Sequence, residues 1–329
     1  MRILSLIFSI FFLISCSNNI SESLNNSSKE TKKTFKPETI PSTKIINENI
    51  AGSIDRYDSF PSSFIKPRTI DVWLPEGYSP KKKYSVLYMN DGQDLFDPSV
   101  DTRKPEMEID ETITRLVAEG KIKNTIAVGI YNIASDRSED YLPQKPIDNL
   151  PTKTRDSMLK IVRAFDKTFE INSDNYLKFI TTEVKPYIDA TYSTQTDINN
   201  TYIAGASMGG LISMYAVCEY PETFGGAIGM STHWVGAIPT PGNPLPEQFF
   251  NYMKVNLPSP TSHKFYFDFG TNGLDRFYTQ YEDEVNEVFT NNGYTDESHF
   301  RNLKFEEGNH NVESWMPRFP DALEMMLGK

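Results

Sequence analysis

Short apolar runs alternate with longer stretches of helical spacing along most of the chain. Runs of strand length stand at residues 68–74, 84–89, 125–130, 201–204, 226–231, 263–269 and 303–305. Apolar residues three and four positions apart predict helices at 107–120, 175–188, 211–220, 276–290 and 312–326. Such alternation is typical of βαβ units, whose strands pair in parallel. The pattern therefore predicts a single α/β domain with a mostly parallel, doubly wound sheet flanked by helices.

Three stretches depart from this regular pattern. Residues 131–172 contain Pro143, Pro146 and Pro151 and are expected to form a loop-rich insertion over the strand ends. Together with the loop at 232–246, this insertion is expected to form the wall of a substrate pocket. Pro186 lies inside the predicted helix 175–188, where the missing backbone donor is expected to kink the helix.

The N-terminus predicts export. Residues 1–15 carry one positive charge and then an apolar run too short to span a bilayer, which is typical of a signal peptide. The following Cys16 completes a sequence, Leu-Ile-Ser-Cys, that resembles the lipobox of bacterial lipoproteins; an ordinary signal with an incidental cysteine is the alternative. Residues 16–44 are mostly polar and predict a flexible tether, which leaves a folded domain over residues 45–329. The chain is expected to be an exported lipoprotein, anchored by a lipid on Cys16 to a membrane of the bacterial cell envelope.

Composition excludes several classes of protein. A net charge of -11 disfavours nucleic-acid binding, because phosphates require a basic face. Cys218, the other of two cysteines, is expected as a buried free thiol, so no disulfide is predicted. The four histidines and two cysteines form no set with zinc spacing. Asp91, Asp94 and Asp97 lack the glycine and glutamate of a calcium loop. No metal is therefore expected, and the oligomeric state is left open.

The strongest candidate for catalysis follows the strand at 201–204. Gly205-Ala-Ser-Met-Gly209 matches the G-x-S-x-G nucleophile elbow, in which a serine lies at a sharp turn between a strand and a helix. The chain must fold back on itself there, so the residues two before and two after the serine must be small. A turn of small residues without chemistry is the alternative. The strand before and the helix after favour Ser207 as a nucleophile.

A serine nucleophile needs a histidine base, which comes last of the catalytic residues in this type of fold. His310 fits, because it lies in a glycine-containing loop just after the last predicted strand. His263 opens a strand and His299 lies in a polar turn, so both are expected at the surface. His233 precedes every candidate acid along the chain and is assigned to the substrate pocket.

Two aspartates are candidates for the carboxylate that orients the histidine. Asp275 lies in a loop and is free to turn toward His310, whereas Asp268 lies in a strand whose pleat fixes its direction. Asp275 is therefore preferred, and the choice between the two stays open.

An oxyanion hole needs backbone N–H donors aimed at the developing negative charge. One donor is assigned to Met208, at the start of the helix that follows Ser207. The second is expected in the turn after strand 84–89, at Gly92 or Gln93.

Several motifs together resemble the "Putative esterase" family of α/β-hydrolases, which includes esterase D, enterochelin esterases, feruloyl esterases and mycolyltransferases. The motifs are Arg68–Tyr78, Tyr88–Phe96, Gly205–Gly210, Phe267–Gly270 and Gly308–His310. The resemblance extends from about residue 50 to the end of the chain. It implies an α/β-hydrolase fold, a triad of Ser207, Asp275 and His310, no cofactor, and ester hydrolysis through an acyl-enzyme. The loop 270–275 departs from the shorter acid loop of many members.

The resemblance also bears on the pocket. Arg137 is similar to a family position that lines the substrate site, although a surface arginine is the alternative. Trp234 and Trp315 are expected either in the pocket wall or in the core.

Three functions are compatible with these residues. The first is a serine carboxylic ester hydrolase acting on an acylated sugar, an aromatic ester of feruloyl type or a siderophore-type ester. The second is an acyltransferase that uses the same acyl-enzyme, and the third is a binding lipoprotein without catalysis. The order of serine, acid and histidine along the chain favours the hydrolase.

Overall fold

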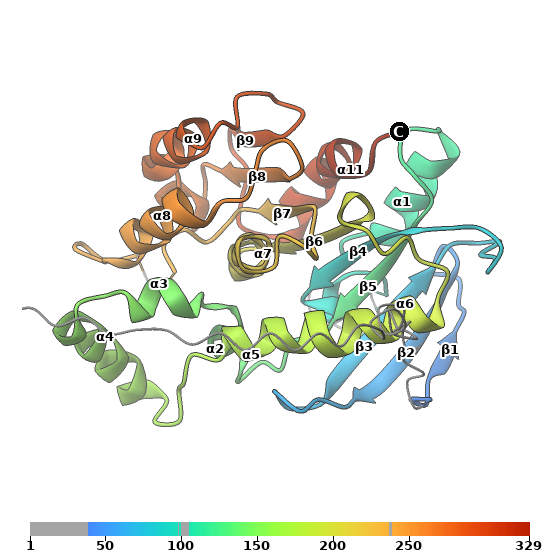
Figure 1. Ribbon diagram of the computed structural model, residues 1–329, viewed down its shortest axis with the longest axis horizontal. Coiled ribbons are helices and arrows are strands. Elements are labelled where there is room, and N and C mark those ends of the chain that lie inside the picture. The colour runs from blue at the N-terminus through green and yellow to red at the C-terminus, as the bar shows by residue number, and fades with distance from the viewer. Residues whose placement is uncertain (1–38, 98, 100–104, 237–238) are drawn as a thin grey trace, which may run out of the picture. The chain divides into compact units, whose positions relative to one another are not determined.

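The structure, a computed structural model, describes residues 39–97, 99, 105–236 and 239–329. The predicted signal peptide, Cys16 and the tether up to residue 38 lie outside these ranges. The strands are β1 Thr43–Ile45, β2 Ser53–Phe60, β3 Arg68–Leu74, β4 Ser85–Asn90, β5 Thr125–Ile130, β6 Thr201–Ala206, β7 Gly226–Met230, β8 Lys264–Gly270 and β9 Phe300–Phe305. They form one sheet in the order β1-β2-β3-β5-β4-β6-β7-β8-β9 (Figure 1).

The sheet is mostly parallel, as predicted, and it is antiparallel at one edge. β1, β2, β3 and β5 pair antiparallel, whereas β5, β4, β6, β7, β8 and β9 pair in parallel. β4 and β5 are buried at every position, as expected for strands covered on both faces. Thr43 already pairs with β2, so the sheet begins two residues before the predicted domain boundary at residue 45.

Helices cover both faces of the sheet. They are α1 Ile109–Ala118, α2 Arg137–Tyr141, α3 Gln144–Asp148, α4 Thr152–Phe165, α5 Ser173–Lys178, α6 Lys185–Thr191, α7 Met208–Glu219, α8 Leu245–Asn256, α9 Glu282–Asn291, α10 Val312–Trp315 and α11 Phe319–Leu327. Along β4, Val86 and Tyr88 pack in the core shared with α5 to α9, whereas Leu87 and Met89 pack in the core shared with α1 and α11 (Figure 1). Within the described ranges, none of these helices has the length and apolar character that crossing a bilayer requires.

Residues 131–172 are more regular than predicted, because they contain α2, α3 and α4 instead of an insertion made mainly of loops. Pro143 and Pro151 stand directly before α3 and α4, where a missing N–H removes no helical hydrogen bond. Pro143 and Pro151 therefore start helices and do not mark loops. Pro186 differs, because it lies inside one continuous helical stretch made of α5, a π-helical segment, Phe179–Val184, and α6. The regular α-helical pattern is interrupted just before Pro186, in the helix where a kink was predicted.

Candidate active site

Ser207 lies at a sharp turn between β6 and α7. Its φ of 58° and ψ of -122° are strained for a residue with a side chain, as expected at a nucleophile elbow. The turn is held by the Ser207 N–H, which donates to the carbonyl of Met230 at 2.8 Å. A Cβ at Gly205 would lie 2.5 Å from the carbonyl carbon of Gly209. The close approach of these two backbones explains why the motif needs glycine.

His310 and Asp275 meet at the carboxyl ends of β8 and β9. The imidazole Nδ1–H of His310 donates to Asp275 Oδ1 at 2.6 Å. The other carboxylate oxygen of Asp275 accepts from the Ser231 hydroxyl at 2.5 Å and from the Gly270 N–H at 2.6 Å. Burial alone raises the pKa of Asp275, but these three hydrogen bonds outweigh burial and hold the pKa below its ordinary value. Asp275 is therefore an ionised carboxylate in contact with His310.

Asp268, the competing candidate, has different partners. Its Oδ1 accepts from the Ser231 N–H at 2.8 Å, and its Oδ2 lies 3.4 Å from Nε of Arg318. Burial raises the pKa of Asp268 to about 7, although the positive charge of Arg318 opposes this rise. The structure thus pairs His310 with Asp275 and directs Asp268 toward Arg318.

Ser207 and His310 lie on the wall of one cavity of about 280 Å³. The cavity is at the carboxyl ends of the parallel strands, where ligands bind in open α/β sheets. Its apolar wall residues are Met89, Leu95, Met107, Met230, Val312 and Phe319. More than 100 residues separate Ser207 from His310 in the sequence, and the parallel strand order brings both to this edge.

The oxyanion candidates differ in their positions. Met208 is the first residue of α7, so its backbone N–H is one of the donors that a helix leaves without an internal partner. Gly92 and Gln93 open a 3-10 helix, Gly92–Asp94. Gln93 lines the cavity, whereas Gly92 packs against Gly129, where an added Cβ would lie 2.5 Å from a backbone carbon. Of the two, Gln93 is the better placed donor.

Arg137 lines the cavity, as its family position implied. Its Nε and one Nη each donate to a carboxylate oxygen of Asp91 at 2.8 Å, and Asp91 Oδ1 also accepts from Asn132 at 2.6 Å. Burial lowers the pKa of Arg137, but the charge and hydrogen bonds of Asp91 outweigh burial and raise that pKa. The guanidinium also lies over the ring of Tyr141, 5.1 Å from its centroid. A fixed ion pair therefore forms one side of the cavity.

The two predicted tryptophans have different positions. Trp315 lines the cavity, its ring meets His310 edge to face at 5.2 Å, and its Nε1–H donates to the Ser231 hydroxyl at 2.8 Å. Trp234 is buried against Phe250 and Phe267 and does not belong to the cavity wall as the described residues form it. Of the two positions expected for Trp234, the structure shows the core, beside α8, and its candidacy for the substrate site is corrected.

His233 is close to Ser207 but does not contribute to the described wall of the cavity. Its backbone N–H donates to the carbonyl of Ser207 at 3.1 Å, and its Nδ1 lies 2.6 Å from the hydroxyl of Tyr278. Burial raises the pKa of the Tyr278 hydroxyl, and the nearby side chain of Ser207 opposes this rise. Tyr278 is thus a neighbour of both His233 and Ser207, and the placement of His233 in the pocket wall is corrected.

Ser231 and Tyr278 are the two site residues that the sequence analysis missed. Ser231 directly follows β7, and its φ of 44° turns the chain so that its hydroxyl meets Asp275. Tyr278 stands three residues after Asp275. The position of Ser231, a polar residue just after a buried parallel strand, could have identified it from the sequence. The sequence around Tyr278 contains no comparable pattern.

The remaining histidines lie elsewhere. His263 is buried, with its Nε2–H donating to the carbonyl of Pro221 at 2.8 Å, so its predicted surface position is wrong. His299 is partly exposed beside Ser298. In the acidic run, Asp97 accepts from Asn47 at 3.1 Å and acts as a polar loop residue.

This fold and site define an α/β-hydrolase with a serine at its nucleophile elbow. A family model described as "Putative esterase" matches residues 62–326. The chain therefore belongs to this family of carboxylic ester hydrolases.

Curated relatives point to the same family. YbbA of Bacillus subtilis (strain 168), an uncharacterized protein, is 22% identical over 272 residues that cover 80% of this chain and 93% of YbbA. The uncharacterized YjcH of the same organism is 24% identical over 183 residues, covering 55% of this chain and 62% of YjcH. An endo-1,4-beta-xylanase/feruloyl esterase of Xylanibacter ruminicola is 26% identical over 180 residues, covering 53% of this chain and 21% of that protein. The chain thus spans less than two thirds of YjcH and about a fifth of the xylanase/feruloyl esterase.

Solved structures share the fold. A ferulic acid esterase superimposes with a TM-score of 0.57 at 21% identity, covering 83% of this chain and 97% of that one. A ferric enterobactin esterase from Salmonella typhimurium gives a TM-score of 0.60 at 14% identity, covering 88% of this chain and 59% of that one. At these identities the likeness establishes the α/β-hydrolase fold.

Proposed function

We propose that the chain hydrolyses esters through an acyl-enzyme on Ser207, with His310 as the base and Asp275 as the carboxylate that orients it. One observation carries this proposal. His310 is hydrogen-bonded to Asp275 at 2.6 Å and lies on the wall of the same cavity as Ser207. The Nδ1–H of His310 is committed to Asp275, so Nε2 is the nitrogen left to accept the serine proton.

In the first half of the reaction, Ser207 Oγ attacks the acyl carbon of the ester and its proton passes to His310 Nε2. The imidazolium that forms is stabilised by the ionised Asp275. The N–H groups of Met208 and Gln93 stabilise the oxyanion, and one such donor is worth about 100- to 1000-fold in rate. His310 then returns the proton to the alcohol oxygen, the C–O bond breaks, and the alcohol leaves an acyl-enzyme.

In the second half, water replaces the alcohol. His310 takes a proton from water, whose oxygen attacks the acyl carbon. Collapse of this second intermediate returns the proton to Ser207 Oγ and releases the acid. If the hydroxyl of another molecule attacked in place of water, the acyl group would pass to that hydroxyl.

For the substrate, we propose an ester with an aromatic acyl group. Apolar side chains and the indole of Trp315 form much of the cavity wall, which suits a ring, and the ion pair of Arg137 with Asp91 offers polar groups for its substituents. The names of similar proteins, a feruloyl esterase, a ferulic acid esterase and a ferric enterobactin esterase, support this choice.

The test is steady-state hydrolysis of a panel that contains feruloyl, 2,3-dihydroxybenzoyl, acetyl-sugar and long-chain acyl esters. We expect aromatic acyl esters to be hydrolysed with a kcat/KM at least tenfold above that of the acetyl esters. Ser207→Ala abolishes turnover of every substrate, whereas Ser298→Ala, at an exposed position, leaves it unchanged. Preference for acetyl sugars rejects the aromatic assignment, and acyl transfer to added alcohols in place of free acid rejects hydrolysis.

We also propose that Cys16 carries the lipid that anchors the protein to a cell-envelope membrane. The support is the sequence at residues 13–16 at the end of an apolar run. Cys218, the other cysteine, is a buried free thiol, which makes it a matched control. In bacteria grown with a labelled fatty acid, we expect label on the wild-type protein and on Cys218→Ser, but not on Cys16→Ser. Label that persists in Cys16→Ser contradicts the anchor.

A further inference from the structure

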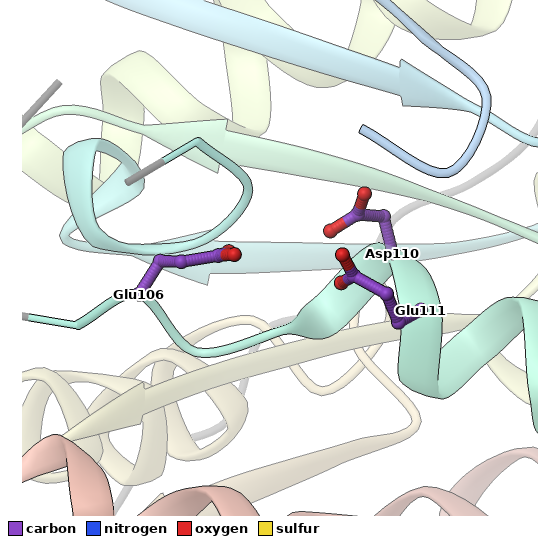
Figure 2. A group of neighbouring side chains, drawn as sticks. All are labelled: Glu106, Asp110 and Glu111. Carbon is purple, nitrogen blue, oxygen red and sulfur yellow. The ribbon is translucent and has the colours of Figure 1, made fainter. Parts of the chain in front are cut away.

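Three carboxylates that do not line the cavity lie together at the start of α1, one on the segment before the helix and two in its first turn. We call this group, Glu106, Asp110 and Glu111, the acidic cluster. One oxygen from each side chain lies within 4.8 Å of the others. Figure 2 shows Glu106 reaching toward the carboxylates of Asp110 and Glu111, which come from the first turn of α1.

One carboxylate oxygen of Asp110 accepts no hydrogen bond from the described residues. The side chain is fully buried, and its Oδ2 accepts from the Ala51 N–H at 2.7 Å. Its Oδ1 is also buried and has no hydrogen-bond partner within the described part of the chain. In Figure 2 the Asp110 carboxylate is turned toward that of Glu111. A buried oxygen without a donor is destabilising, and more so when it is charged, so the cluster is suited to a positively charged partner.

The charges around the cluster point the same way. Three carboxylates lie close together, and the first turn of α1 offers only about half a positive charge to balance them. A cation bound between the carboxylates would reduce their mutual repulsion.

We propose that the acidic cluster binds Ca²⁺ through one oxygen each of Glu106, Asp110 and Glu111, with water completing the coordination. Calcium takes six to eight oxygen ligands at about 2.3–2.6 Å, so oxygens on opposite sides of the ion are about 4.6–5.2 Å apart. The oxygens of the cluster already lie within that span. Magnesium requires ligands at about 2.0–2.1 Å in a strict octahedron, so the three carboxylates fit it less well.

This inference goes beyond the proposed esterase function and does not depend on it, but the site is linked to the cavity. Met107, next to Glu106, lines the cavity, and its N–H donates to the carbonyl of Asp94 at 2.8 Å. The N–H of Ile109 donates to the carbonyl of Leu95, another wall residue, at 3.3 Å. A calcium ion at the cluster would therefore fix the segment that forms this part of the cavity wall.

The test is calorimetric titration of CaCl₂ into the full-length, chelator-treated protein at pH 8, with thermal unfolding measured in parallel. We expect one Ca²⁺ per chain and a rise in Tm of several degrees. Asp110→Asn and Glu106→Gln are each expected to weaken binding at least tenfold. Glu106→Gln changes a partly exposed residue, so it keeps the test valid if Asp110→Asn fails to fold.

Glu119→Gln is the matched control, because Glu119 caps the other end of α1 and pairs with Lys121 at 3.1 Å. It is expected to bind calcium like the wild type. The proposal is overturned if the wild-type protein shows no heat of binding up to millimolar Ca²⁺. It is also overturned if Glu119→Gln weakens calcium binding as much as the cluster variants do. A Tm that rises only with acidification and ignores Ca²⁺ shows that the cluster holds a proton instead. Tighter binding of Mg²⁺ than of Ca²⁺ overturns the choice of ion.

Discussion

The hydroxyl of Ser231 connects the carboxylate of Asp275 to the indole of Trp315. It donates to Asp275 Oδ2 at 2.5 Å and accepts from Trp315 Nε1 at 2.8 Å. Ser231→Ala removes one of the three donors that hold Asp275, and it leaves those of His310 and Gly270 in place. The carboxylate keeps its charge but loses the contact that fixes its rotation toward His310.

The size of the effect follows from the loss of one hydrogen bond to a charged group, which is worth about 1.5–3 kcal/mol. Each 1.4 kcal/mol expressed in the transition state is about tenfold in rate. Part of the loss appears as lower stability, so we expect kcat to fall about 5- to 50-fold, with KM nearly unchanged. Loss of the donor also raises the pKa of Asp275, which moves the acidic limb of the kcat/KM profile to higher pH.

The assay is hydrolysis of a p-nitrophenyl ester between pH 5 and 9, with unfolding in urea measured on the same samples. Thr232→Val is the matched control. Thr232 is the next residue, is fully buried, and its hydroxyl has no hydrogen-bond partner within the described ranges. We expect wild-type activity for Thr232→Val. A Ser231→Ala enzyme that unfolds more easily but keeps its kcat and pH profile would show that Ser231 has a purely structural role.

Three further predictions concern the two aspartates near His310, Tyr278 and the acidic cluster. Asp275→Asn is expected to lower kcat about 1000-fold or more, because His310 loses its carboxylate; Asp268→Asn, which alters a group paired with Arg318, changes kcat only a few-fold, and the reverse order contradicts the assignment. Tyr278→Phe removes a hydroxyl that is bonded to His233 and lies beside Ser207, and it is expected to lower kcat/KM about 2- to 10-fold, whereas an unchanged value refutes a positioning role. Burial raises the pKa of Glu106 and of Asp110, so between about pH 5 and 8 the folded chain holds protons there that the unfolded chain has lost. In the presence of a chelator, the free energy of unfolding is therefore expected to fall as the pH rises through this range. The same pH dependence in Asp110→Asn argues against the cluster as its cause.

Local patterns predicted the sheet and the sharp turn at Ser207 well. The apolar runs of β4 and β5 are buried along their whole length, and Gly205 is required by its contact with the backbone of Gly209. Both features depend on residues close together in the sequence. The prolines of residues 131–172 are also a local signal, but the loops predicted from them are wrong, because Pro143 and Pro151 directly precede helices.

Features that depend on long-range contacts were harder to predict. The partnership of His310 with Asp275 followed from chain order and loop position, but the role of Ser231 depends on a turn after β7 that brings it to a carboxylate 44 residues away. The sequence around Trp234 could not decide between the pocket wall and the core, where its indole packs against Phe250 and Phe267. The acidic cluster has none of the spacing of a calcium loop, because Glu106 lies before α1 and Asp110 and Glu111 lie in its first turn.

The most direct test of the proposed mechanism is covalent labelling by a fluorophosphonate probe, followed by mass spectrometry of the tryptic peptides. The probe phosphonylates a serine only where a base activates it. We predict one adduct per chain on Ser207, with labelling strongly slowed in His310→Ala and absent in Ser207→Ala. A folded wild-type protein that stays unlabelled, or an adduct on another residue, contradicts the proposed catalytic site.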